Sequence, residues 1–139
     1  MPYSMNRIIA SLYDELTPEQ RAKYIEAIDF YAPGVEYEGA ATGANKVWQC
    51  YSMIVRGILA QDEAKIKMGV DGLGTEFKYV DTGDGFYEDG SFVQHGWIPY
   101  TGGYGNGMLA DLTTISSLLH GSQWQLPEQY SGMLGSWVE

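Results

Sequence analysis

The sequence predicts an all-α protein built from antiparallel helix pairs and one long loop. Apolar residues recur every three or four positions in six separate stretches, which is the spacing of an amphipathic helix. Residues 81–107 interrupt this pattern with a run rich in glycine and aromatic residues, far longer than an ordinary connection between helices. The chain has 139 residues, of which 45% are hydrophobic, enough for one domain-sized core.

The first helix pair precedes residue 32. Its first helix is expected to end near Leu16, because an apolar stripe runs to that point through Met5, Ile8, Ile9, Leu12 and Tyr13. The segment Thr17-Pro18-Glu19-Gln20 then predicts the start of a second helix, since a threonine cap, a proline at the first helical position and a glutamine three residues after the cap form a capping box. Pro33-Gly34 ends this helix after about Tyr31.

Two further pairs are expected along the chain. Apolar spacing predicts a third helix over about 45–60 and a fourth over about 63–77, which Asp62 can cap. Glycines in the second half of the fourth helix lower its helix propensity. After the long loop, the same spacing predicts a fifth helix over 108–119 and a sixth over 127–137. The six helices therefore form three αα-hairpins.

Successive hairpins are typical of a solenoid or toroid of helix pairs. We therefore expect residues 1–139 to form a single segment, an arc of such a toroid, with an irregular six-helix globule as the alternative. Each hairpin in a toroid buries its apolar stripe against the next one, so an arc exposes apolar edges. Such edges predict self-association.

Composition argues against several classes of partner. The net charge is −10, from 8 Lys and Arg against 18 Asp and Glu, so no nucleic acid partner is expected. The longest apolar runs are too short to cross a bilayer, so no membrane partner is expected either. The sequence does not start with a basic segment followed by an apolar one, and we expect no signal peptide in this chain. A single cysteine, Cys50, cannot form an internal disulfide.

The loop over 81–107 is expected to be ordered and to line a cleft, because disordered segments are poor in aromatic residues. Gly102-Gly103-Tyr104-Gly105 has no strand before it and no lysine after it, which argues against phosphate binding. A solvated turn is expected for the acids Asp81, Asp84, Glu88 and Asp89, since glycines occupy positions where a calcium loop needs ligands. One cysteine and two histidines predict no metal site, and no cofactor is expected. Neither a glycosidase carboxylate pair nor a serine hydrolase motif is evident.

Three residues suit the removal of a proton beside a carboxylate: Asn45, His95 and Tyr104. The amide of Asn45, at a helix start, can hydrogen-bond a uronate carboxyl and stabilise the enolate-like charge that develops. A neutral imidazole or an ionised phenol can take the proton, and a phenol can return one to the leaving glycosidic oxygen. By spacing alone, a purely structural role for the loop histidine stays open.

Four segments carry motifs of a known enzyme family. They are Thr42-Gly43-Ala44-Asn45-Lys46-Val47-Trp48, Thr82-Gly83-Asp84-Gly85-Phe86-Tyr87, Asp89-Gly90-Ser91-Phe92-Val93-Gln94-His95 and Tyr100-Thr101-Gly102-Gly103-Tyr104-Gly105. These segments resemble the hyaluronate, chondroitin and xanthan lyases of polysaccharide lyase family 8. The resemblance covers nearly the whole chain, since the first 17 residues and the stretch from Leu118 to Trp124 are also similar to the family. It implies an arc of an incomplete α/α toroid.

The resemblance also implies a reaction and a site. The reaction is β-elimination of a uronic-acid-containing polysaccharide, with hyaluronan favoured over chondroitin and xanthan. By motif, Asn45 would neutralise the uronate carboxyl, Tyr104 would protonate the leaving oxygen, and either His95 or Tyr104 would abstract the proton. The residues expected to contact sugar are Trp48, Trp97 and Tyr100, with a buried core position as the alternative for Trp48. An extracellular location is implied as well.

Parts of the family pattern fall outside this sequence. The family has an aromatic segment upstream of the first residue, an arginine motif downstream of the last one, and β-sandwich domains, none of which is present here. We therefore expect an excised arc of the catalytic domain, or a truncated gene product, with a cationic wall supplied by the missing part. Two functions stay open: a lyase acting on anionic polysaccharides, and a noncatalytic carbohydrate-binding or structural fragment. Whether the isolated chain is active stays open as well.

Overall fold

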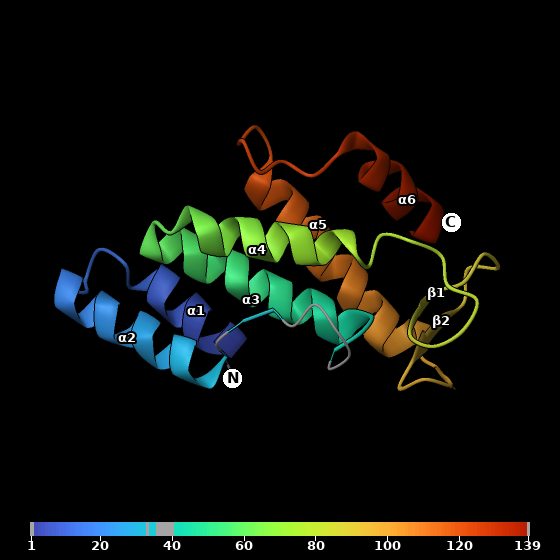
Figure 1. Cartoon of the computed structure of the whole chain (residues 1–139), viewed down its shortest axis with the longest axis horizontal. Coiled ribbons are helices and arrows are strands. Elements are labelled where there is room, and N and C mark those ends of the chain that lie inside the picture. Colours follow the sequence, from blue (N-terminus) through green and yellow to red (C-terminus); the bar gives the residue numbers. More distant parts are fainter. Residues whose placement is uncertain (1, 33, 36–40, 139) are drawn as a thin grey trace.

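The computed structural model describes residues 2–32, 34–35 and 41–138. Over these ranges the chain forms six α-helices: α1 Pro2–Ser11, α2 Pro18–Tyr31, α3 Ala44–Ala60, α4 Glu63–Gly74, α5 Asn106–Leu119 and α6 Glu128–Val138. The predicted all-α class is confirmed, while the arc of a toroid stays a prediction. Figure 1 shows α3 and α4 side by side, with a small sheet beyond the end where α3 begins. No helix in the described ranges is long and apolar enough to cross a membrane.

The α1–α2 pair follows the predicted signals except at the end of α1. The Gln20 N–H donates to Thr17 Oγ1 at 3.3 Å and the Thr17 N–H donates to Gln20 Oε1 at 2.9 Å, which is the predicted capping box of α2. However, α1 ends at Ser11, earlier than the sequence predicts. The Tyr13 carbonyl accepts a hydrogen bond from Arg21 Nη1 at 2.9 Å, and the Thr17 N–H that a longer helix would offer it is already used in the capping box.

The α3–α4 hairpin brings two helix backbones close together. A Cβ atom at Gly69 would lie 2.6 Å from Ile54 Cγ1 and 2.9 Å from the Cys50 carbonyl oxygen, so a side chain at this position would force the helices apart. Asp62 caps α4 as predicted, because its Oδ1 accepts a hydrogen bond from the Lys65 N–H at 3.2 Å. This hairpin supplies the rigid support on which the loop and α5 pack.

The end of α4 frees an aromatic residue for packing on α6. The helix ends at Gly74 instead of continuing to Phe77, since glycines in its last turns disfavour further helix. Phe77 stacks on Tyr130 of α6 with ring centroids 4.0 Å apart, and Trp137 of α6 stacks on Phe86 at 4.6 Å. Aromatic contacts with the segment after α4 therefore hold α6 in place.

One apolar core joins α3, α4, α5 and the loop. Its fully buried members include Ala44, Val47, Cys50, Ile54, Leu73, Phe92, Leu112 and Ile115. A smaller cluster of Ile9, Ile28 and Leu59 joins α1 and α2 to α3. Burial raises the pKa of the Cys50 thiol to about 12, so this cysteine stays protonated and serves as a core residue.

The loop over 81–107 contains a small sheet and a π-helix that the sequence pattern did not predict. The strands β1 Gly85–Phe86, β2 Phe92–Gln94 and β3 Ile98–Pro99 pair antiparallel in the order β1-β2-β3. Strands of two or three residues are too short to give a detectable alternation. A π-helix, η1 Thr101–Gly105, then runs directly into α5. The loop is thus ordered, as its aromatic residues predict.

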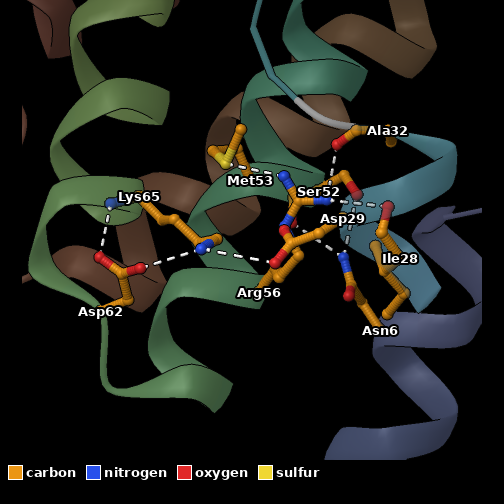
Figure 2. A network of polar contacts seen from close by, with 9 residues as sticks. All are labelled: Asn6, Ile28, Asp29, Ala32, Ser52, Met53, Arg56, Asp62 and Lys65. Carbon is orange, nitrogen blue, oxygen red and sulfur yellow. Dashed lines mark hydrogen bonds and ion pairs between the residues drawn. The ribbon is translucent and has the colours of Figure 1, made fainter. Parts of the chain in front are cut away.

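A buried guanidinium joins α3 to α2, and a lysine of α4 shares its carboxylate partner (Figure 2). Arg56 of α3 is 1% exposed, and its Nε lies 3.1 Å from Asp29 Oδ1. Its Nη1 donates to the carbonyl oxygens of Ile28 at 3.2 Å and Ala32 at 2.7 Å, at the C-terminal end of α2. Lys65 of α4 reaches the same carboxylate at 3.5 Å. Burial lowers the pKa of Arg56, and the negative charge of Asp29 opposes that shift. The ion pair therefore stabilises the charged guanidinium at this buried position.

Candidate active site

Helix α3 begins beside the loop, and Asn45 is its second residue. The preceding Gly43 has a φ of +57°, and a Cβ there would lie 2.8 Å from Gln94 Oε1, so this position requires glycine. Glu76 Oε2 accepts a hydrogen bond from the Gly43 N–H at 2.8 Å, and Gln94 Oε1 accepts one from the Ala44 N–H at 3.1 Å. Two protein acceptors thus occupy the backbone donors of Gly43 and Ala44, just before Asn45.

His95 begins the turn that joins β2 to β3. The turn consists of residues 95–97, between the paired ends Gln94 and Ile98. His95 has a φ of +59° and Gly96 a φ of +79°. Left-handed backbone is uncommon for a residue with a side chain, although histidine adopts it more often than most. The His95 side chain is exposed, so its imidazole is accessible to a ligand.

Tyr104 lies at the centre of a cluster of four rings. This cluster, here called the aromatic group, consists of Trp48, His95, Tyr100 and Tyr104. The Tyr104 ring centroid is 5.0 Å from that of His95, 5.3 Å from that of Trp48 and 5.0 Å from that of Tyr100. The His95 and Tyr100 rings meet it edge to face, at 82° and 80°. Tyr104 comes from η1 and Trp48 from α3, so the group joins the loop to the helix.

Asn45 and Trp97 are the predicted site residues outside this group. Asn45 precedes Trp48 by three positions on α3, and residues at that spacing share a helix face. Trp97 is 80% exposed at the tip of the β2–β3 turn, and no ring of the described residues stacks on it. Trp48 is 37% exposed, which excludes the buried core position that was its alternative. The structure thus brings His95, Tyr104 and two aromatic residues together and leaves Trp97 apart.

Two residues that the sequence pattern did not single out fasten the loop to α3. Asp84 Oδ2 accepts hydrogen bonds from Thr42 Oγ1 at 2.6 Å and from Gln94 Nε2 at 2.5 Å, and its Oδ1 accepts one from the Gly96 N–H at 2.6 Å. The expectation that Asp84 belongs to a solvated turn is therefore wrong, because this carboxylate is half-buried and engaged in three hydrogen bonds. The other acids of the turn, Asp81, Glu88 and Asp89, are exposed as expected.

The alternation of β2 explains the burial of Gln94, although a strand of three residues is too short to be recognised in the sequence. Phe92 and Gln94 are two positions apart on β2, so they point to the same face of the sheet, and both are fully buried. A strand prediction at this point would have placed the amide of Gln94 in the core beside Phe92. A buried amide needs polar partners, which directs attention to the start of α3.

Comparison with known proteins identifies the family. A profile described as "Polysaccharide lyase family 8, N terminal alpha-helical domain" matches residues 1–139. The chain belongs to polysaccharide lyase family 8. It is 37% identical over 141 residues to a xanthan lyase of Bacillus sp. strain GL1 and 37% identical over 139 residues to a hyaluronate lyase of Thermasporomyces composti. Each alignment includes 99% of this chain, but 15% of the xanthan lyase and 18% of the hyaluronate lyase.

Solved structures of family 8 lyases have the same fold. The Streptomyces coelicolor A3 chondroitin AC lyase in complex with chondroitin sulphate superposes with a TM-score of 0.93 at 40% identity, over 99% of this chain and 19% of that one. A Paenibacillus xanthan lyase gives 0.88 at 38% identity, over 99% and 13%. The family 8 chain thus spans less than a fifth of the length of these relatives. Xanthan, hyaluronate and chondroitin lyases are similarly close, so the comparisons do not single out hyaluronan.

The family 8 site offers hydrogen-bond and proton-transfer chemistry. The residues predicted from the sequence contribute the amide of Asn45, the imidazole of His95 and the phenol of Tyr104. In the described ranges, no group of three or more His, Cys, Asp or Glu side chains is arranged to hold a metal ion. An amide can bind a carboxylate, and an imidazole beside a phenol can take up and release a proton.

Proposed function

We propose that Asn45, His95 and Tyr104 carry out β-elimination on a uronic-acid-containing polysaccharide. The observation that supports this most strongly is the contact of the His95 and Tyr104 rings, 5.0 Å apart, on a loop fastened to the helix that begins beside Asn45. A base and an acid at this separation can act on neighbouring atoms of one sugar ring. Membership of polysaccharide lyase family 8 supports the same reaction class.

In the proposed reaction, the side-chain N–H of Asn45 donates to the uronate carboxylate. Partial neutralisation of that charge makes the adjacent C5 proton more acidic and stabilises the enolate-like transition state. The His95 imidazole or the Tyr104 phenolate takes the proton. The electrons of the broken C5–H bond form the C4=C5 double bond as the C4–O bond breaks, and the Tyr104 O–H protonates the leaving oxygen. No water is consumed.

The contact between the His95 and Tyr104 rings also offers a path by which the abstracted proton is returned to Tyr104. When Tyr104 is the base, it passes the same proton to the leaving oxygen. When His95 is the base, the proton it has taken must reach Tyr104 before the next turnover. The two ring centroids lie 5.0 Å apart, so this transfer takes place between side chains in contact.

We propose hyaluronan as the substrate, with chondroitin and xanthan as the alternatives. Similarity to a hyaluronate lyase supports it, although a xanthan lyase is as similar. The exposed rings of Trp97 and Tyr100 offer flat apolar surfaces beside the site, suited to the apolar face of a sugar. Both rings lie on the same loop as His95, so a polymer that contacts them passes the proposed base.

The proposal is tested by incubating the chain at high concentration with each of the three polymers. Elimination produces a conjugated, unsaturated uronate, which absorbs in the ultraviolet. The heat-denatured chain is the control. Rising absorbance with native protein supports the proposal, and its absence with all three polymers contradicts catalysis by this chain.

A noncatalytic carbohydrate-binding role is the second candidate, and the 80% exposure of the Trp97 side chain favours it. Exposed tryptophan fluorescence responds when a sugar covers the ring, so a titration with short oligosaccharides of each polymer detects binding. Quenching of fluorescence without formation of unsaturated uronate would support binding alone.

We also propose that the protein acts outside the cell. Polymers of this class are too large to enter a cell intact, so their first cleavage takes place where they are found. Antibody detection of the protein in culture medium, compared with washed cells, tests the location.

Self-association through apolar edges is proposed from the exposed apolar residues of the helices. Among the described residues these include Ile8 and Leu12 near α1, Phe30 and Tyr31 on α2, and Leu118 on α5. Apolar side chains in contact with water favour association when they gather on one surface. Sedimentation velocity over a range of protein concentrations distinguishes a monomer from an associating chain.

A further inference from the structure

A hydrogen-bonded clamp joins the loop to the start of α3. The clamp consists of Thr42, Asp84 and Gln94. Gln94 is fully buried, and both polar atoms of its amide are used. Its Oε1 accepts from the Ala44 N–H at 3.1 Å, and its Nε2 donates to the Thr42 carbonyl at 3.2 Å and to Asp84 Oδ2 at 2.5 Å. A buried amide with these partners has one orientation, so the clamp is rigid.

The clamp holds the chain on both sides of His95. Gln94 precedes this residue and Gly96 follows it. The Gly96 N–H donates to Asp84 Oδ1 at 2.6 Å, while Asp84 Oδ2 accepts from Gln94 Nε2. The same carboxylate accepts from the Thr42 hydroxyl at 2.6 Å. One side chain therefore ties both neighbours of His95 to the segment that leads into α3.

The backbone of His95 needs such support. Its φ of +59° lies in the left-handed region, which residues with a side chain avoid unless surrounding contacts hold them there. The bonds to Gln94 and Gly96 act on either side of this strained residue. Without them the turn can relax, and the imidazole would move away from the Tyr104 ring.

A single hydrogen bond also links the neighbours of two proposed catalytic residues. The Ala44 N–H, one residue before Asn45, donates to the side chain of Gln94, one residue before His95. Because consecutive Cα atoms are about 3.8 Å apart, a shift of Gln94 is passed directly to the separation of Asn45 and His95. The side chains are tightly packed against the backbone at this point, since a Cβ at Gly43 would lie 2.8 Å from Gln94 Oε1 and 3.2 Å from Asp84 Cβ.

We propose that Asp84 and Gln94 are positioning residues that set the placement of the His95 imidazole relative to Asn45 and Tyr104. They act through the backbone of His95, without contact to the reacting atoms. The catalytic consequence rests on the proposed function, whereas the geometric consequence does not. The two consequences are therefore measured separately.

The geometric test uses nuclear Overhauser effects between the His95 and Tyr104 rings in the 139-residue chain. His120→Gln assigns the imidazole signals, since the chain has two histidines. Asp84→Asn removes a charged acceptor, and the His95–Tyr104 effects should be lost. The effects between Phe77 and Tyr130, which stack at 4.0 Å and have no part in the clamp, should persist and show that the fold is intact. Retention of the His95–Tyr104 effects would overturn the proposal.

Thr42→Val gives the same comparison if Asp84→Asn does not fold. It removes one hydroxyl donor to Asp84 and leaves Gln94 in place. The His95–Tyr104 effects should weaken by a measurable fraction, again with the Phe77–Tyr130 effects unchanged. Unaltered intensities in a folded Thr42→Val chain would also overturn the proposal.

The catalytic test compares four variants by the formation of unsaturated uronate. Asp84→Asn and Gln94→Glu should each lower kcat by about a hundredfold, the effect of misplacing a catalytic group by about 1 Å, with little change in KM. Gln94→Glu sets a second carboxylate against that of Asp84. The double variant, Asp84→Asn together with Gln94→Glu, again pairs one amide donor with one carboxylate acceptor and should recover part of the lost kcat. Asp89→Asn makes the same exchange in the same loop, where the exposed carboxylate accepts a hydrogen bond from the nearby Ser91 N–H, and should leave kcat unchanged.

Two outcomes of the catalytic test would count against the proposal. Wild-type kcat in both single variants would overturn it, and so would equal losses in the single and double variants. A wild-type chain without activity would contradict the proposed function alone, because the geometric test still decides the role of Asp84 and Gln94.

Discussion

The imidazole of His95 meets the ring of Tyr104 edge to face, at 82° and with ring centroids 5.0 Å apart. His95 lies in the turn after β2 and Tyr104 lies in η1, nine residues later. Tyr104 also packs on Trp48 of α3, the helix whose second residue is Asn45. The groups proposed to donate and accept the proton are therefore in contact with each other, and they and the amide of Asn45 can each be altered separately.

Replacing Tyr104 by phenylalanine should abolish proton donation and keep the structure. The ring contacts with Trp48, His95 and Tyr100 do not need the hydroxyl, so the melting temperature should be unchanged. The loss of a general acid lowers kcat by about 10²–10⁴-fold. Steady-state rates of uronate formation and a thermal melt measure both effects.

Tyr130→Phe is the matched control for this exchange. Tyr130 stacks on Phe77 away from the loop, so removing its hydroxyl should leave kcat unchanged. Equal activities of the Tyr104→Phe and wild-type chains would show that Tyr104 is not the proton donor.

Asn45→Asp should separate stability from activity. An aspartate in the first turn of α3 interacts favourably with the helix dipole, so the free energy of unfolding should stay equal or rise slightly. The same carboxylate repels a uronate and offers no N–H, so kcat/KM should fall by at least the 10²–10³-fold expected for loss of one donor. Asn45→Ala should show the loss of the donor without the repulsion. An Asn45→Asp chain with wild-type kcat/KM would contradict the role of the amide.

The helices could be predicted from the sequence because their signals are local. The capping box at Thr17 and Gln20 and the cap at Asp62 lie within four residues of the helix starts that they mark. The early end of α1 was missed because it depends on a tertiary contact, in which Arg21 takes the Tyr13 carbonyl. Local patterns therefore located the helices better than their ends.

The sequence predicts the residues of the candidate site but not the hydrogen bonds that fasten the loop to α3. Asn45, His95 and Tyr104 were found from residue types and family motifs, and their roles stay predictions. The clamp joins residues 42 and 50 positions apart in the sequence, Thr42 to Asp84 and Ala44 to Gln94. Its strand has three residues, too few for a recognisable alternation, so nothing local marked Gln94 as buried.

Trp97→Ala should weaken substrate binding without lowering stability. The side chain is 80% exposed, so its removal costs the folded state little. Covering one face of the ring with a sugar accounts for about 1.4 kcal/mol of binding, and KM should rise about tenfold. Phe30→Ala is the control, because Phe30 on α2 is 79% exposed and lies outside the site. An equal KM in the Trp97→Ala and wild-type chains would remove Trp97 from the substrate-binding surface.

Arg56→Met should destabilise the helical scaffold. The change leaves Asp29 without its closest cation and removes the donor to the carbonyls of Ile28 and Ala32. Breaking a buried ion pair costs 3–5 kcal/mol, and the lower end applies because Asp29 is partly exposed and Lys65 is nearby; we expect about 3 kcal/mol from urea unfolding.

Lys67→Met is the matched control for Arg56→Met. It breaks the exposed pair with Asp71, whose atoms lie 2.6 Å apart, and should cost less than about 0.5 kcal/mol. Similar losses in the two variants would show that burial of Arg56 does not determine its contribution.

The central claim is that the site breaks a glycosidic bond by elimination, and the fate of solvent oxygen tests it most directly. The chain is incubated with hyaluronan in isotopically labelled water, and the products are analysed by mass spectrometry, with Tyr104→Phe as the reference. Elimination predicts fragments that end in an unsaturated uronate and contain no oxygen from the solvent, formed by the wild-type chain and greatly reduced for the variant. Fragments that carry labelled oxygen and a saturated uronate would show hydrolysis and contradict the claim.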